Sequence, residues 1–268
     1  MSAGRTAFLE RYQQGTSLVH RLDPRFKLLA TLGFVVAATS TPPPAWPALV
    51  LLAGLAWGAI GLAGIPWGQA LRRSAIALPF AGMVALSLPF TQAGRVVWAW
   101  SLWGWELTIT DAGLLLFATI LVKAWLSVLV SGLLVATTRF PDLLLGLQSL
   151  RVPEALTATI SFMYRYLFVL VDEALRMRTA REARSVGTGR TVLWRARVLG
   201  GLIGSLFIRS YERSERIYAA MLDRGYAGEI RSLTRLTWQR RDSWAALAWG
   251  LALLGVALVA RLSSVRVG

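Results

Sequence analysis

The chain has 268 residues, of which 55% are hydrophobic and only 16% are charged, against roughly 25% charged residues in an average soluble domain. Together with a mean hydropathy of +0.53, this composition predicts a membrane protein. The absence of cysteine excludes a disulfide-stapled scaffold and a thiol enzyme, and the single histidine, His20, leaves the chain without the usual ligands of a zinc or soft-metal site. The formal charge of +15 points to cytoplasmic faces and lipid headgroups rather than to nucleic acid.

Five apolar stretches approach the length of about 20 residues that a helix needs to cross a bilayer. They cover residues 26–39, 46–65, 75–90, 112–136 and 244–260. The third stretch contains Pro79 and Pro89, which a membrane helix tolerates when its neighbours satisfy the freed carbonyls. Because the N-terminus runs into the first stretch without a small-residue cleavage site, we expect no signal peptide.

The basic residues alternate between the two sides of the predicted spans. Five basic residues precede or begin the first span and two follow the second, which predicts a cytoplasmic N-terminus: Arg5, Arg11, Arg21, Arg25, Lys27, Arg72 and Arg73. The loop before the fourth span has Arg95 as its only basic residue and carries alternating tryptophans: Trp98, Trp100, Trp103 and Trp105. We therefore expect a short hairpin at the outer interface, whose tryptophans form an aromatic belt.

Residues 139–243 form a basic region with eighteen arginines against ten acidic residues, which predicts a cytoplasmic location. Its prolines and glycines divide it into three predicted helices, over residues 141–150, 154–185 and 194–223. The run 155–171 is apolar, but Arg165 in its middle would cost roughly +2.5 to +3.5 kcal/mol on membrane insertion. We expect this helix to pack beneath the membrane bundle, with a sixth crossing as the alternative.

The predicted fold is therefore an all-α polytopic membrane protein with about five transmembrane helices and a cytoplasmic coupling region of long amphipathic helices. The expected domains are an N-terminal bundle of four spans (residues 1–138), the cytoplasmic helices (139–243) and a C-terminal span (244–268).

The two long cytoplasmic helices end alike, each with an arginine beside a small residue. The first ends at Ala183, Arg184 and Ser185 before a glycine stop, and the second at Asp223, Arg224 and Gly225. Arginines at helix C-termini interact favourably with the macrodipole, for about 0.3 to 1 kcal/mol each, which is one explanation. The other is that an exposed guanidinium docks onto acidic or carbonyl groups of a partner.

Lys123 lies near the centre of the fourth predicted span, where a buried cation is costly and often functional. A proton or ion relay would need partners, yet the four N-terminal spans contain no Asp, Glu or His. A structural role is the better interpretation, in which the ammonium bonds carbonyls near Pro79 or faces a subunit interface.

Two other function classes fit the residues less well. A membrane-embedded enzyme would need converging acid, base or nucleophile groups, whereas Asp172, Glu173 and Glu182 stand among arginines at helical spacing, as on a solvated, salt-bridged face. A nucleic-acid binder would need base-stacking aromatics on a compact basic surface, but the aromatics lie mostly in the spans or the outer loop.

Four segments together resemble one known family. They are residues 20–29 (HRLDPRFKLL), 163–168 (MYRYLF) with Asp172 and Glu173, 204–213 (GSLFIRSYER) and 221–226 (MLDRGY). Over about residues 18–232 the chain resembles the CbiQ-type transmembrane T component of energy-coupling factor (ECF) transporters, cobalt and nickel subgroup.

The resemblance implies that the chain is not an enzyme but a coupling subunit, held in the bacterial cytoplasmic membrane by several spans. In that family two Ala-Arg-Xaa motifs end the coupling helices and grip two cytoplasmic ABC ATPases, which bind ATP and Mg²⁺. Arg184 matches the first motif and Arg224 the second, with Asp223 at the position of the alanine.

The resemblance also implies a separate membrane subunit that binds the substrate, with or without a small accessory subunit. Phe162, Met163 and Phe168 would press on that subunit. The substrate would be Co²⁺ or Ni²⁺, in cobalt transport for cobalamin biosynthesis, and no metal or cofactor would be bound by this chain. A T component shared by several vitamin-binding subunits is the alternative.

Overall fold

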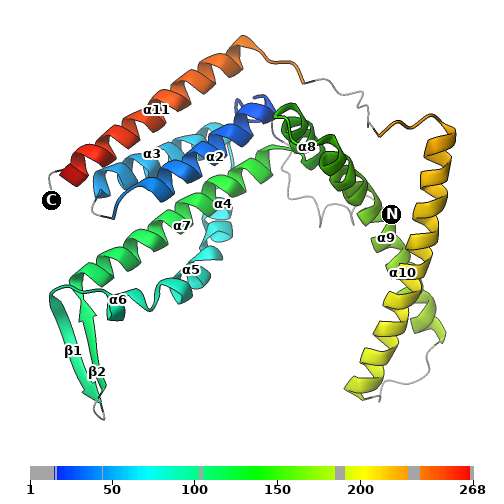
Figure 1. Ribbon diagram of the computed structural model, residues 1–268, viewed down its shortest axis with the longest axis horizontal. Coiled ribbons are helices and arrows are strands. Elements are labelled where there is room, and N and C mark those ends of the chain that lie inside the picture. Colours follow the sequence, from blue (N-terminus) through cyan, green and yellow to red (C-terminus); the bar gives the residue numbers. More distant parts are fainter. Residues whose placement is uncertain are drawn as a thin grey trace. The chain divides into compact units, whose positions relative to one another are not determined.

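The computed structural model describes residues 15, 17–43, 45–102, 105–184, 191–228 and 236–265, and these residues are mostly helical (Figure 1). The chain divides into two compact units. One, here called the bundle, comprises Phe8–Gly146 and Leu236–Gly268. The other, the α9–α10 unit, contains Leu147–Arg235. Each is described by itself.

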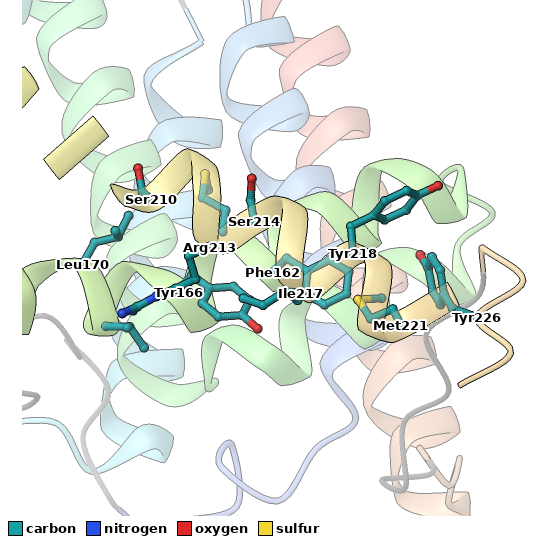
Figure 2. A pocket seen from close by; sticks show the side chains of 12 residues that line it. Phe162, Tyr166, Leu170, Ser210, Arg213, Ser214, Ile217, Tyr218, Met221 and Tyr226 are labelled. Atoms are coloured by element: carbon teal, nitrogen blue, oxygen red, sulfur yellow. The ribbon is translucent and has the colours of Figure 1, made fainter. Parts of the chain in front are cut away.

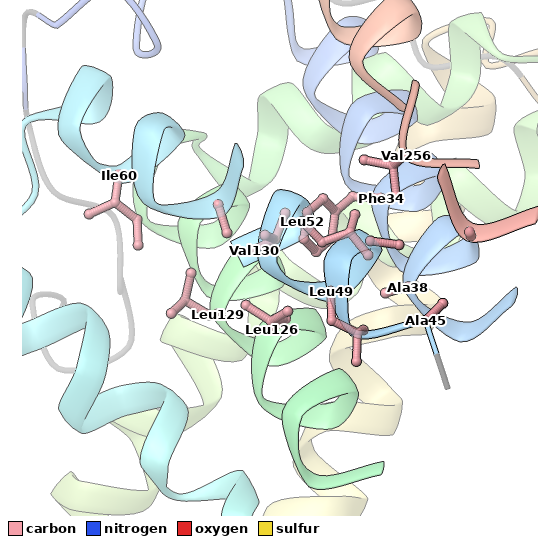
Figure 3. Close-up of a cluster of buried hydrophobic side chains, with 13 residues drawn as sticks. Phe34, Ala38, Ala45, Leu49, Leu52, Ile60, Leu126, Leu129, Val130 and Val256 are labelled. Carbon is pink, nitrogen blue, oxygen red and sulfur yellow. The ribbon is translucent and has the colours of Figure 1, made fainter. Parts of the chain in front are cut away.

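The bundle contains α2 (Pro24–Ser40), α3 (Trp46–Ala63), α7 (Asp111–Thr137) and α11 (Arg240–Val265) around a shared apolar core. Phe34 of α2, Leu49 of α3 and Leu126 of α7 are almost completely buried, and Val256 of α11 is close to it. Figure 3 shows these side chains converging from the four helices. Alanines such as Ala38 and Ala56 let the helix backbones approach closely, which is how membrane helices associate without a hydrophobic driving force.

The third predicted span, residues 75–90, lies within an apolar segment long enough to cross a membrane, Trp67–Thr91, but the helix there is interrupted twice. The structure has α4 (Trp67–Ala75), α5 (Ala77–Ala85) and α6 (Leu88–Thr91). A proline lacks the N–H that would bond the carbonyl four residues earlier, and α4 and α5 end at the residues four before Pro79 and Pro89. Beside the first break, Trp125 of α7 donates its indole N–H to the Ser74 hydroxyl at 2.8 Å.

The predicted hairpin is confirmed. Strands β1 (Val96–Leu102) and β2 (Trp105–Thr110) pair antiparallel, with Leu102 opposite Trp105 and a bulge between Val96 and Trp98. The second strand leads directly into α7, where the Thr110 hydroxyl caps the helix by accepting the Gly113 N–H at 3.3 Å.

Within the described residues, five helical segments are long and apolar enough to span a membrane: Trp46–Ala63, Trp67–Thr91, Asp111–Thr137, Glu154–Arg184 and Arg240–Ser263. Four of them correspond to predicted spans, and the fold is the expected all-α polytopic one. The first predicted span, α2, has 17 residues and is about 26 Å long, short of the roughly 30 Å hydrocarbon core. The helix α9 (Glu154–Arg184) is also long and apolar enough to be a span. Its length and composition therefore allow the sixth crossing, whereas the cost of inserting Arg165 argues against it.

The α9–α10 unit consists of α9 and α10 (Val192–Asp223), close to the bounds expected from sequence. The short helix α8 (Phe140–Ser149) precedes them and was also expected. Between α8 and α9, Arg151 adopts a left-handed backbone with φ of 67°, at the position after a helix where glycine is usual. The domain boundaries at residues 138 and 243 stay predictions.

Candidate functional site

The helices α9 and α10 are joined by polar contacts along their length. The Glu173 carboxylate of α9 accepts hydrogen bonds from Arg176 of its own helix at 2.7 Å and from Arg209 of α10 at 3.1 Å. These two guanidinium groups, Arg176 foremost, hold the pKa of the Glu173 carboxyl below its usual value. At neutral pH the carboxylate is therefore ionised and links the two helices.

The end of α10 has a well-defined geometry. The Tyr226 N–H bonds the Met221 carbonyl at 3.0 Å and the Gly225 N–H bonds the Leu222 carbonyl at 2.9 Å, which is the Schellman pattern of a helix C-terminus. Gly225 supplies the left-handed backbone, with φ of +79°, that this pattern needs. Arg224 is the C-cap residue and its side chain is exposed, as are Asp223 and Gly225.

The end of α9 is also exposed. Arg184 is the last residue of the helix, and both Arg184 and Ala183 are accessible to solvent. One turn earlier, the Arg181 guanidinium lies over the Trp194 ring of α10, 5.2 Å from its centroid. Ser185, the third residue of the predicted motif, lies outside the described residues, as do Gly187 and Gly189.

An open, mainly apolar cavity of about 400 Å³ lies in the α9–α10 unit, lined by both helices (Figure 2). Of the three side chains expected to press on a substrate-binding subunit, Phe162 and Met163 line it. Phe168 does not; its ring instead packs edge-on against Tyr164, with centroids 5.2 Å apart.

The sequence did not predict the side of this cavity that is formed by α10 and the turn after it. This side includes Tyr218, Met221 and Tyr226, the last two being the residues that the Schellman pattern brings together beside Arg224. Met221 lies in the last turn of α10, whereas Tyr226 follows the helix, and the turn at Gly225 brings the two together. The cavity is therefore adjacent to the arginine-bearing end of α10.

Lys123 bonds backbone carbonyls, as expected, but these carbonyls lie at the end of α2. Its ammonium donates to the carbonyl of Thr39 at 3.2 Å and to that of Thr41, at the C-terminal end of α2 rather than near Pro79. The last carbonyls of a helix have no partner within it, so Lys123 supplies the donor that carbonyls at the end of α2 lack.

Two of the three acidic residues considered for catalysis, Glu173 and Glu182, form ion pairs. Glu182 accepts from Arg178 at 2.7 Å, as Glu173 does from Arg176. Within the described part of the chain, no three His, Asp or Glu side chains group as metal ligands. The arrangement can bind a partner through arginines and an apolar cavity, and it brings no acid and base together.

Known proteins match the chain over most of its length. The model of the family CbiQ, described as cobalt transport protein, matches residues 15–236. An energy-coupling factor transporter transmembrane protein EcfT of Lacticaseibacillus paracasei is 32% identical over 94% of this chain and 98% of its own. EcfT of Limosilactobacillus fermentum is 31% identical over 85% of this chain and 88% of its own, and an uncharacterised protein of Methanocaldococcus jannaschii is 30% identical over 85% and 78%.

These matches include all four segments that carry the resemblance seen in the sequence. They also agree with the several membrane-spanning segments of the structure, which make the chain a multi-pass membrane protein. The chain therefore belongs to the CbiQ family of transmembrane T components, as its sequence motifs predict.

Proposed function

We propose that this chain is the transmembrane energy-coupling subunit of an ECF-type importer. The observation that carries the proposal is the pair of long helices, α9 with 31 residues and α10 with 32, each ending in an exposed arginine. An exposed guanidinium at a helix end can donate two parallel hydrogen bonds to a carboxylate of a partner. Arg184 and Arg224 are thus the points at which two cytoplasmic ABC ATPases would hold the chain.

The same two helices would carry the motion of the ATPases. A 31-residue helix is about 46 Å long, enough to carry a displacement from one end of the α9–α10 unit to the other. The link between Glu173 and Arg209 and the stacking of Arg181 on Trp194 make α9 and α10 move as a pair. The apolar cavity beside Phe162 and Met163 would meet the substrate-binding membrane subunit, so that closure of the ATPases displaces that subunit.

The substrate we propose is Co²⁺, or Ni²⁺, held by the separate membrane subunit, with or without a small accessory subunit. The description of the matching family as cobalt transport protein supports this choice. The chain itself would bind no metal or cofactor and would catalyse no reaction, since ATP and Mg²⁺ belong to the partner ATPases. Its single histidine and lack of cysteine suit a subunit that leaves metal binding to another.

In the proposed orientation the chain lies in a bacterial cytoplasmic membrane with its N-terminus and the α9–α10 unit in the cytoplasm. The positive-inside distribution supports it, because the arginine-rich segment 139–243 and the basic residues before α2 then share one side.

A second candidate is a T component that serves several vitamin-binding subunits. The relatives named EcfT favour it, because their names state the energy-coupling role and no metal. The two candidates differ in the partner subunit and in nothing that α9 or α10 would do.

Purification of the protein from its native membrane in mild detergent, followed by mass spectrometry of what co-purifies, tests the proposal. Two copies of ABC ATPase with one His-rich membrane protein would establish the metal importer, and vitamin-binding subunits would establish the shared type. A preparation that contains no ABC ATPase would overturn the proposed function.

A further inference from the structure

A cluster of buried charges lies in the bundle, away from the arginine-bearing helix ends. Lys27 of α2 is only 6% exposed, and its ammonium donates to the carbonyls of His20 and Thr137, each at 3.2 Å. Thr137 is the last residue of α7, so the cation lies against the carbonyl end of that helix, where the macrodipole favours it.

Asp242 of α11 is the opposite charge in this cluster, and it is 3% exposed. One carboxylate oxygen accepts the Gln239 N–H at 2.8 Å, just before α11 begins, and the other accepts the Asp23 N–H at 2.9 Å. Asp23 is in turn the N-cap of α2, because its side chain accepts the Arg25 N–H at 2.8 Å. The Asp242 carboxylate therefore joins the N-termini of two helices, where negative charge is favoured.

These two charges lie close enough to act on one another. Asp142, near the start of α8, and Asp23 and Asp242 are the carboxylates that interact electrostatically with the Lys27 ammonium. Burial of a charge without such compensation would be strongly destabilising. Lys27 and Asp242 each also have two hydrogen-bond partners.

A close backbone approach holds α8 to the same place. A Cβ atom on Gly146 would lie 3.0 Å from the Leu28 side chain and 3.6 Å from the backbone of Pro24 and Arg25. Glycine thus lets α8 come against the first turn of α2, next to Lys27.

The buried cluster contacts residues near both chain connections between the bundle and the α9–α10 unit. Leu147–Arg235 is connected to the bundle at two junctions, one after Gly146 and one before Leu236. Thr137 and Gly146 hold the first junction to the start of α2, and Asp242 holds the second to the same helix start. Residues near both junctions therefore contact the same buried cluster at the start of α2.

We propose that Asp23, Lys27 and Asp242 form a junction anchor, which keeps the two connections of the α9–α10 unit at a fixed separation so that helix motion reaches the bundle without loss. The proposal rests on the proposed coupling function, and it makes Lys27 and Asp242 positioning residues. The competing explanation is that they only cap helices and stabilise the fold.

Lys123→Met provides a matched control for Lys27→Met. Both lysines donate to helix-end carbonyls in the bundle, but the carbonyls of Thr39 and Thr41 lie far along the chain from either junction. A purely stabilising role predicts that each substitution lowers the melting temperature and leaves transport per ATP unchanged, whereas an anchor predicts that Lys27→Met alone also lowers transport per ATP.

The test is a spin-label distance measurement on the full chain in lipid nanodiscs. Because the natural chain has no cysteine, Pro141→Cys and Thr237→Cys place one label beside each junction and nowhere else. We expect Lys27→Met and Asp242→Asn to broaden the distance distribution, and Lys123→Met to leave it narrow. If Lys27→Met does not accumulate in the membrane, Lys27→Gln and Asp242→Asn decide by the same criterion.

In the assembled transporter, Lys27→Met should retain the ATPases yet transport at least about fivefold less substrate per ATP. About fivefold is the lower end of the effects that coupled sites in proteins usually have on one another. An unchanged distribution in the Lys27 and Asp242 variants, or equal broadening in Lys123→Met, would overturn the anchor. The distances are measured on the chain without partners, so they decide the anchor even if no ATPase binds the natural chain and the proposed function fails.

Discussion

The ammonium of Lys123, in the middle of α7, donates to the carbonyl of Thr39, in the last turn of α2, at 3.2 Å. The same ammonium also donates to Thr41, just beyond that helix. An intramembrane lysine that would otherwise suggest an ion pathway is thus a C-terminal cap supplied from a neighbouring helix.

Replacement of Lys123 by methionine should therefore lower stability and leave coupling intact. The two carbonyls lose their donor, which we expect to cost about 1 kcal/mol in the free energy of unfolding. Thermal unfolding in detergent measures the loss, and substrate transported per ATP in proteoliposomes should equal that of the natural chain. Normal assembly with lost transport would instead indicate an ion relay.

Two glycines of α7 should respond oppositely to alanine. A Cβ on Gly113 would lie 2.6 Å from the Leu88 carbonyl oxygen and 2.6 Å from the Pro89 Cα, both backbone atoms that cannot move aside cheaply. We expect Gly113→Ala to cost about 1 to 3 kcal/mol. Gly132, with no atom within 4 Å of its would-be Cβ, is the matched control, and Gly132→Ala should be neutral or gain up to about 1 kcal/mol. Equal melting temperatures of the two variants would contradict the packing of α6 against α7.

The link between α9 and α10 should depend on pH. Because the pKa of Glu173 is lowered in the folded chain, its ion pairs contribute fully above the ordinary glutamate pKa and are lost as the pH falls through the lowered value. Glu173→Gln should thus lower the melting temperature slightly at neutral pH, and the difference should vanish once the pH is low enough to protonate the Glu173 carboxylate in the folded chain. The double variant Glu173→Gln with Arg209→Gln should be no less stable than Glu173→Gln alone. Additive losses would show that the two residues act separately.

A topology reporter fused after Gly268 should report the outer side of the membrane. With α2, α3, the α4–α6 segment, α7 and α11 crossing, a cytoplasmic N-terminus implies an external C-terminal end. A reporter inserted after Arg151 should be cytoplasmic and serves as the control. A cytoplasmic signal after Gly268 would mean that α9 crosses, despite Arg165.

The long helices were predictable because their signals are local. The Pro153–Glu154 start of α9 and the Gly225 stop of α10 lie beside the residues that they affect, and both helices have nearly the expected bounds. The third span was less well predicted, because the effect of Pro79 and Pro89 depends on whether neighbours such as α7 can hold the freed turns. Here the hydrogen bond from Trp125 of α7 to Ser74 lies beside the interruption that precedes Pro79.

The contacts of Lys27 could not be predicted from the sequence alone. In the sequence, Lys27 counted as one more basic residue at the start of the first span. Its partner Thr137 is 110 residues away, and the contact between Asp23 and Asp242 joins residues 219 apart. Only folding brings these groups together. Likewise, the carbonyl-binding role of Lys123 followed from the cost of burying a charge, but which carbonyls it binds did not.

The most direct test of the account is whether Arg184 and Arg224 hold the ATPases. The variant Arg184→Glu with Arg224→Glu, purified from membranes that contain the partner ATPases, should retain none of them while its melting temperature stays that of the natural chain. Arg216→Glu reverses an exposed arginine within α10 rather than at its end, and this control variant should retain them. ATPases that stay bound to the doubly substituted chain would contradict the assignment of the helix ends as the coupling site.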